Sequence, residues 1–171
     1  LDVSIADVSS GTGVLPSPFL GSDFYLSQAQ AGRAFALNLY VGQDISDDGS
    51  TGPGNAVDLL GEASAVPGPA VPTINSAVAV DITAHAGQDG GFSYAEIEIL
   101  GETMAHESGH YLGLFHPVEF ADDSRSTFIE GDLQSDTSTC ATTTTCVTQG
   151  TATNLMFPTP VFGVPLQRDL S

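Results

Sequence analysis

Apolar and polar residues alternate along several segments in the first half of the chain, and this period of two predicts β-strands. Residues 1–8 (LDVSIADV) and 76–83 (SAVAVDIT) alternate in this way, and residues 34–41 (AFALNLYV) form a longer run of β-forming type. Residues 42–55 are rich in Gly, Pro and Asp, which predicts a loop. Residues 59–72 are interrupted by prolines, which predicts an extended connection.

The periodicity changes to that of a helix after the breaker GQDGG at residues 87–91. Ser93 is followed three residues later by Glu96, a capping-box pattern that predicts a helix over residues 94–112. Apolar residues recur at helical spacing within this range. Gly101 is unfavourable inside a helix, so a later start at Gly101 is the alternative.

The same helix carries the segment HESGHYLGLFH, in which three histidines and one glutamate have the spacing of a metal site. His106 and His110 are four residues apart, so both imidazoles face the same side of a helix. Gly113 allows the helix to end in a turn, after which His116 approaches as a third ligand. Three imidazoles leave the fourth position of a tetrahedral zinc ion open to water, as in catalytic sites. Glu107 is placed to act as the general base.

The histidines allow two other interpretations. A helix that is merely rich in histidine gives no reason for the glutamate and the glycine at these positions. The remaining histidine, His85, follows the predicted strand 76–83. Because the motif already supplies three ligands, we expect His85 to be a loop histidine and not a fourth ligand.

The motif matches the long zinc signature H-E-x-x-H-x-x-G-x-x-H and therefore resembles that of the metzincin metallopeptidases. The resemblance implies a methionine-containing turn beneath the metal, and Met156 in TATNLMFPTP stands at that place. Met104 lies in the helix and is expected in the core. The segment GDLQSDT resembles the acidic segment that helps to bind calcium in the pappalysin-like branch. By that resemblance, Asp132 and Asp136 are candidate calcium ligands.

The resemblance implies an α+β fold of the metzincin-like zincin type, with a twisted mixed β-sheet, an active-site helix and an irregular C-terminal subdomain containing the Met-turn. In one catalytic domain, residues 1–113 would form the subdomain with the sheet and the zinc helix. Residues 114–171 would form the subdomain with the third ligand and Met156. The strand 76–83 would border the cleft and pair with an extended substrate. Residues 157–162 would wall the pocket for the residue after the cleaved bond.

Three features depart from the usual metzincin pattern. Pro158 stands where many metzincins have a tyrosine, so no tyrosine is assigned a role at the oxyanion. Pro117 resembles the corresponding position of the serralysins, and the turn LMFP resembles that of the matrixins. Residues 27–34 offer only a short helix in place of the long backing helix that such domains usually have.

The composition predicts one acidic, secreted domain. The chain has 171 residues, of which 41% are hydrophobic and 14% charged, enough for a single core. An excess of acidic residues, three arginines and no lysine give a net charge of −18, which argues against nucleic acid and anionic membranes as partners. No apolar run is long enough to span a membrane. The chain begins at Leu1 without a signal-peptide pattern, so we expect a mature or trimmed fragment, and a monomer.

Cys140 and Cys146 are six residues apart in the segment CATTTTC. In an oxidising compartment they would close a short Thr-rich loop as a disulfide. Two free thiols or a second metal site are the alternatives, without a C-x-x-C spacing to support them.

The motif and the resemblance together predict a secreted zinc-dependent endopeptidase that acts on a peptide or protein substrate. Water bound to Zn²⁺ would be activated by Glu107, which would then deliver the proton to the leaving amine. Two alternatives remain. One is a non-catalytic zinc-stabilised binding or adhesion module, which has no use for Glu107, and the other is a zinc hydrolase of non-peptide substrates. Ca²⁺ is a further expected cofactor through the resemblance alone.

Overall fold

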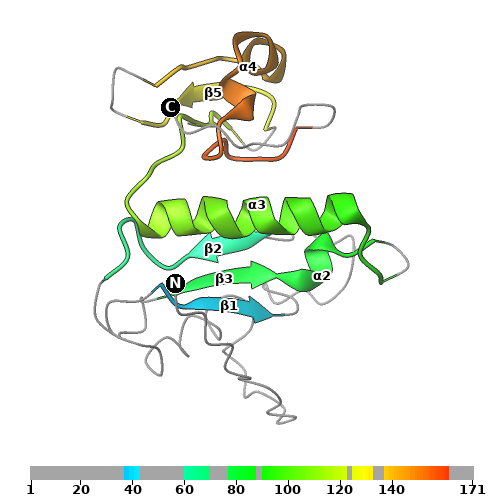
Figure 1. Ribbon diagram of the computed structural model, residues 1–171. Helices are drawn as coiled ribbons and strands as arrows, with labels where there is room; N and C mark the ends of the chain where they lie inside the picture. The colour runs from blue at the N-terminus through cyan, green and yellow to red at the C-terminus, as the bar shows by residue number, and fades with distance from the viewer. Residues whose placement is uncertain are drawn as a thin grey trace.

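The computed structural model of the chain describes residues 37–42, 60–69, 77–87, 90–122, 125–132 and 137–161. The predictions for residues 1–8 and 27–34, and nearly all of the loop predicted for 42–55, lie outside these ranges. The described elements form a small sheet, a long helix α3 against it, and a second region on the other side of that helix (Figure 1).

Three strands form a mixed sheet in the order β1–β3–β2. Strand β1 (Leu39–Gly42) pairs in parallel with β3 (Val78–Asp81). Strand β2 (Gly61–Ala63) pairs antiparallel with the other side of β3, with Gly61 opposite Val80. All four residues of β3 are buried, so the central strand lies in the core.

The strand predictions agree with the structure in part. Strands β1 and β3 overlap the predicted strands 34–41 and 76–83, but β3 ends at Asp81 because a helix begins at the next residue. Strand β2 lies inside residues 59–72, for which only an extended connection was predicted. Because β3 is paired on both sides, the prediction that residues 76–83 pair with a substrate is wrong, and the edge strand next to α3 is β2.

Helix α2 (Ile82–His85) follows β3 without a loop. Asp81 ends the strand and caps the helix, because its side chain accepts two backbone N–H groups of the first turn. His85 is buried in this helix, not in a loop as predicted. Its Nδ1 is hydrogen-bonded to the carbonyl oxygen of Asp81, and its Nε2 lies 2.8 Å from Oγ1 of Thr103 on α3. His85 therefore joins the two helices and lies apart from the histidine cluster.

Helix α3 (Tyr94–Tyr111) begins with the predicted capping box. The side chain of Ser93 accepts from the N–H of Glu96, and the Glu96 carboxylate accepts from the N–H of Ser93. This confirms the predicted start and excludes the alternative at Gly101. The helix lies across β2 and β3 (Figure 1). The core between helix and sheet contains Val78, Val80 and Tyr111, with Ala63, Leu100 and Met104 packed against them.

The residues after α3 form a second small core. It is built from β4 (Val118–Phe120), β5 (Phe128–Glu130), α4 (Thr143–Gln149) and the 3₁₀-helix η2 (Thr151–Thr153). Strands β4 and β5 pair antiparallel. The buried residues of this core are Val118, Phe128, Cys140, Cys146, Ala152 and Phe157.

The disulfide predicted between Cys140 and Cys146 is present in this core. The Thr-rich segment between the two cysteines is not a loop as predicted, because it begins α4. Thr142 and Thr145 form a capping box, each side chain bonded to the backbone N–H of the other. The cross-link therefore ties the start of a helix to the segment that precedes it.

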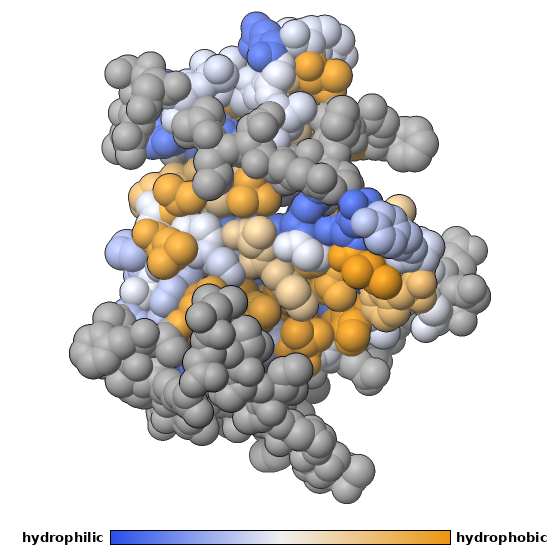
Figure 2. All heavy atoms as spheres, viewed as in Figure 1, coloured by the Kyte–Doolittle hydropathy of each residue, from blue (hydrophilic) through white to orange (hydrophobic). Residues whose placement is uncertain are grey.

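The described elements form an α+β fold, as predicted at the level of class. Several large apolar side chains of α3 and of the turn after it are exposed, and Figure 2 shows apolar surface beside the helix. None of the described helices is long and apolar enough to cross a membrane.

Candidate metal centre

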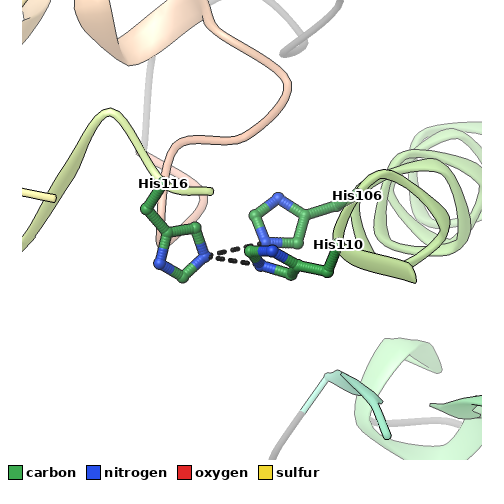
Figure 3. Close-up of side chains that lie close together, drawn as sticks. All are labelled: His106, His110 and His116. Carbon is green, nitrogen blue, oxygen red and sulfur yellow. Dashed lines mark hydrogen bonds between the residues drawn. The ribbon is translucent and has the colours of Figure 1, made fainter. Parts of the chain in front are cut away.

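Helix α3 holds two of the three predicted metal ligands, and the turn after it holds the third. His106 and His110 lie one turn apart in the last part of the helix. Gly113 has a φ of 103°, a left-handed conformation that a side chain would disfavour. Its N–H donates to the carbonyl oxygen of His110 at 2.9 Å, and the chain turns so that His116 faces the other two histidines (Figure 3).

The Nε2 atoms of the three imidazoles converge. Nε2 of His116 lies 3.1 Å from Nε2 of His106 and 2.9 Å from Nε2 of His110. Nitrogen ligands at about 2.05 Å around a tetrahedral zinc ion are about 3.3 Å apart. The spacing therefore fits a single ion. Among the residues that the structure describes, this is the only group of three His, Cys, Asp or Glu side chains that could hold one.

Hydrogen bonds to the backbone set the tautomer of the two helical histidines. Nδ1 of His106 lies 2.7 Å from the carbonyl oxygen of Leu155, and Nδ1 of His110 lies 2.8 Å from that of Leu114. A carbonyl only accepts hydrogen bonds, so each Nδ1 carries the hydrogen. The neutral ring then has its lone pair on Nε2, the atom that points into the cluster.

The third histidine has a side chain as its partner. Nδ1 of His116 donates to Oε1 of Glu119 at 2.8 Å. This hydrogen bond is the main cause that holds the pKa of Glu119 below its usual value, so the group that accepts is a carboxylate. Glu119 was not among the predicted site residues, and its signal in the sequence is only a glutamate three residues after the third histidine.

The electrostatics of the cluster favour a cation between the rings. Burial is the largest cause that lowers the pKa of His106 to about 4, and it also lowers the pKa of His110, helped by the neighbouring His116. Both helical rings are therefore neutral near pH 7, and their Nε2 lone pairs face the Nε2 of His116. At 3.1 and 2.9 Å, these nitrogens are close enough to be bridged either by a proton in a hydrogen bond or by one metal ion. The donor set fits a divalent ion that prefers imidazole, such as zinc.

Met156 packs against α3 beside the histidines. A Cβ built on Gly109 would lie 2.5 Å from Sδ of Met156, so the missing side chain at Gly109 makes room for the methionine. Oδ1 of Asn154 accepts from the N–H of Met156 at 2.7 Å and fixes the turn. The carbonyl between them, that of Leu155, is the partner of His106. The predicted methionine turn therefore touches the motif through both a side chain and a backbone group.

Glu107 is buried between α3 and β2, with 8% of its surface exposed. Burial raises the pKa of Glu107 to about 8, a hydrogen bond from the N–H of Ala63 opposes the shift, and the nearby charge of Glu62 adds to it. A Cβ on Gly61 would lie 2.7 Å from Cγ of Glu107. The close approach of β2 therefore positions this carboxylate.

His106 and Glu107 line a cleft of about 330 Å³. The other residues that line it are Leu60, Gly61, Ile99, Glu102, Thr103, Phe120, Arg125, Phe157, Pro158, Thr159 and Pro160. Residues 157–160 belong to the segment 157–162 that was predicted to wall a pocket beside the metal. Phe162 lies outside the described residues.

The structure describes one of the two predicted calcium ligands. Oδ2 of Asp132 accepts from the hydroxyl of Thr137 at 3.1 Å. Asp136 lies outside the described residues, so a calcium site remains a prediction.

Comparison with known protein families, with curated proteins and with solved structures finds no match for this chain. The function therefore has to be inferred from the histidine cluster, the buried carboxylate and the cleft.

Proposed function

We propose that this protein is a secreted zinc-dependent endopeptidase of the metzincin type. One observation carries the proposal: the first histidine of the cluster and the carboxylate of Glu107 line the same cleft. A site that only stabilises the fold has no need of a glutamate that is not a ligand, held at this position. The same arrangement would suit a hydrolase, because an ion held by His106 would lie near Glu107 in a cleft that a substrate can enter.

The histidines would hold the ion, and Glu107 would handle the proton. When bound, zinc supplies a Lewis acid that polarises a carbonyl and lowers the pKa of water. In its ionised form Glu107 takes the proton of the attacking water and delivers it to the leaving amine. The positive charge of a bound zinc ion would favour that form, because it opposes the effect of burial on the pKa of Glu107. The N–H of Ala63 donates to Glu107 and orients its side chain. The backbone of Gly61 packs against Cγ of Glu107 and restricts the rotation of that side chain.

Strand β2 supplies the edge at which an extended peptide would bind. Backbone groups in an antiparallel pair point alternately toward and away from the partner strand. The pairing with β3 directs the backbone groups of Glu62 toward the sheet and those of Gly61 and Ala63 away from it. Because the N–H of Ala63 donates to Glu107, a peptide would bond to the remaining outward groups. A peptide that pairs with this edge extends the sheet beside Glu107. The residue after the cleaved bond would face the apolar wall of residues 157–160.

The order of elements supports the metzincin resemblance. A sheet with an antiparallel edge strand is followed by a helix with two candidate ligands, a glycine turn, the third candidate ligand and a methionine turn. The disulfide supports secretion, because such cross-links persist in oxidising compartments.

Hydrolysis of a pool of quenched fluorescent peptides tests the proposal. The wild type is compared with Glu107→Gln and with Glu130→Gln at matched zinc content. The control removes the same charge from Glu130, an exposed residue at the end of β5 that does not line the cleft. We expect the wild type and the control to cleave, and Glu107→Gln to lose at least about 100-fold in rate, the usual contribution of a general base.

Two outcomes would contradict the proposal in different ways. A zinc-loaded wild type that cleaves no peptide would refute the endopeptidase. It would favour a zinc-stabilised binding module or a zinc hydrolase of non-peptide substrates. Cleavage by Glu107→Gln at the wild-type rate would refute the role of Glu107 as the base.

A further inference from the structure

One histidine of the cluster differs from the other two in the group that accepts the hydrogen bond from its Nδ1–H. His106 and His110 donate to backbone carbonyls, whereas His116 donates to the carboxylate of Glu119. A carboxylate carries a full negative charge that a carbonyl lacks, and it raises the basicity of a ligating imidazole. We infer that Glu119 is a positioning residue that sets the metal affinity of the cluster through His116.

Strand β4 places Glu119 on the side where His116 lies. Side chains alternate between the two faces of a strand. Val118 is fully buried in the core, so the next residue, Glu119, points to the opposite face. Its partner on β5 is Ile129, which is also exposed. The backbone of Glu119 therefore stays in β4 while its carboxylate contacts the imidazole of His116, three residues earlier in the chain.

Gly131, which directly follows β5, packs closely against His116 and Glu119. A Cβ on Gly131 would lie 2.7 Å from the carbonyl oxygen of His116 and 3.0 Å from Cγ of Glu119. The N–H of Gly131 donates to the carbonyl oxygen of Pro117 at 3.2 Å. Because the backbone packs this closely against the stem of Glu119, the side chain has little freedom to lose when it bonds to His116.

Because Glu119 is exposed, its substitution should change metal binding without a large loss of folding stability. Its side chain is 49% exposed, so its removal leaves no buried cavity and no buried charge without a partner. Water can accept the Nδ1–H of His116 in a variant, but without a fixed direction and without the charge. Loss of such a partner typically weakens metal binding by about 10–100-fold.

The inference rests on the proposed zinc site, and its test separates the two. The zinc affinity of the metal-free protein is measured by competition with a chromogenic chelator. The proteins compared are the wild type, Glu119→Gln, Glu119→Ala and the control Glu130→Gln, which removes a charge from the facing strand. We expect Glu119→Ala to bind zinc about 10–100-fold more weakly. The zinc affinity of Glu119→Gln should lie between those of the wild type and Glu119→Ala, because glutamine keeps an acceptor without the charge. The control should bind zinc like the wild type.

Cobalt(II) gives a second readout, because its visible absorption reports the ligand geometry. We expect the spectrum of Glu119→Ala to shift and that of Glu119→Gln to stay close to the wild type. Equal zinc affinities and equal cobalt spectra in all proteins would overturn the inference and leave the zinc site in place. A wild type that binds no zinc would overturn the site, the proposed function and this inference together. If Glu119→Ala fails to fold by circular dichroism, Glu119→Gln decides: weaker binding supports the inference and wild-type affinity overturns it.

Discussion

Two glycines of α3 allow one substitution to be made in two different environments. Gly101→Ala and Gly109→Ala each gain about 1 kcal/mol of helix propensity. A Cβ on Gly101 would meet nothing within 4 Å. A Cβ on Gly109 would lie 2.5 Å from Sδ of Met156 and 3.5 Å from Cδ1 of Leu114. Because the propensity term cancels, the difference in unfolding free energy between the two variants measures mainly the contact with Met156.

The size of this difference follows from the packing. Overpacking a core costs about 1–3 kcal/mol. Met156 is 3% exposed, but its thioether is flexible, which favours the lower half of that range. Gly109→Ala should therefore change stability by about 0 to −1 kcal/mol, and Gly101→Ala should add about 1 kcal/mol. The two melting temperatures should differ by about 2–8 °C in a domain of this size.

Urea denaturation and thermal unfolding of the metal-free protein measure this difference. A zinc titration adds a second test, because Gly109→Ala also displaces the turn whose Leu155 carbonyl orients His106. We expect weaker zinc binding in Gly109→Ala and unchanged binding in Gly101→Ala. If Gly109→Ala is as stable as Gly101→Ala and binds zinc like the wild type, Met156 does not pack against the helix at this position and the reasoning is refuted.

Three further predictions concern the edge strand, the disulfide and the metal. Gly61→Ala would place a Cβ 2.7 Å from Cγ of Glu107, so peptide hydrolysis should fall while zinc affinity is kept, and unchanged hydrolysis would contradict this. Replacing Cys140 and Cys146 by serine should lower the unfolding free energy by about 2 kcal/mol, the chain-entropy value for so short a loop. Urea denaturation measures this loss, and wild-type stability would speak against it. Removing zinc with a chelator should abolish hydrolysis and lower the unfolding free energy, by about 2.7 kcal/mol relative to protein in zinc at 100 times its Kd. Both should return when zinc is added back, and a chelator-treated protein that still cleaves peptides would exclude the metal from the reaction.

The features that could be predicted from the sequence are those whose signals are local. The capping box of Ser93 and Glu96 needs only three residues of spacing, and it fixed the start of α3 correctly. The histidine cluster was expected because His106 and His110 share a helix face and Gly113 permits the turn, both short-range properties. The disulfide likewise joins two cysteines that are close in sequence.

The features that were missed depend on contacts between distant segments. Strand β2 has only three residues, too short a run to predict a strand, so its pairing with β3 identifies it as one. That pairing also places β3 in the centre of the sheet, which no local pattern reveals. The partner of His106 was missed for the same reason, because it lies 49 positions away, whereas the partners of His110 and His116 are near in sequence but carry no distinctive signal. Leu155 acts through its backbone carbonyl, which every residue possesses, and Glu119 acts through a strand geometry that its sequence neighbours only partly indicate.

The hydrogen bonds that orient the three imidazoles also imply an order of events during synthesis of the chain. Two of them join residues only three or four positions apart, whereas His106 and Leu155 are separated by 49 positions. As the polypeptide leaves the ribosome, two rings can acquire their partners once Glu119 has emerged. The third has no partner until Leu155 has been added and the methionine turn has docked. The nascent chain therefore has two oriented imidazoles, whereas His106 has no partner for its Nδ1 until Leu155 has been added. Tight binding of the proposed metal ion would follow the docking of the methionine turn.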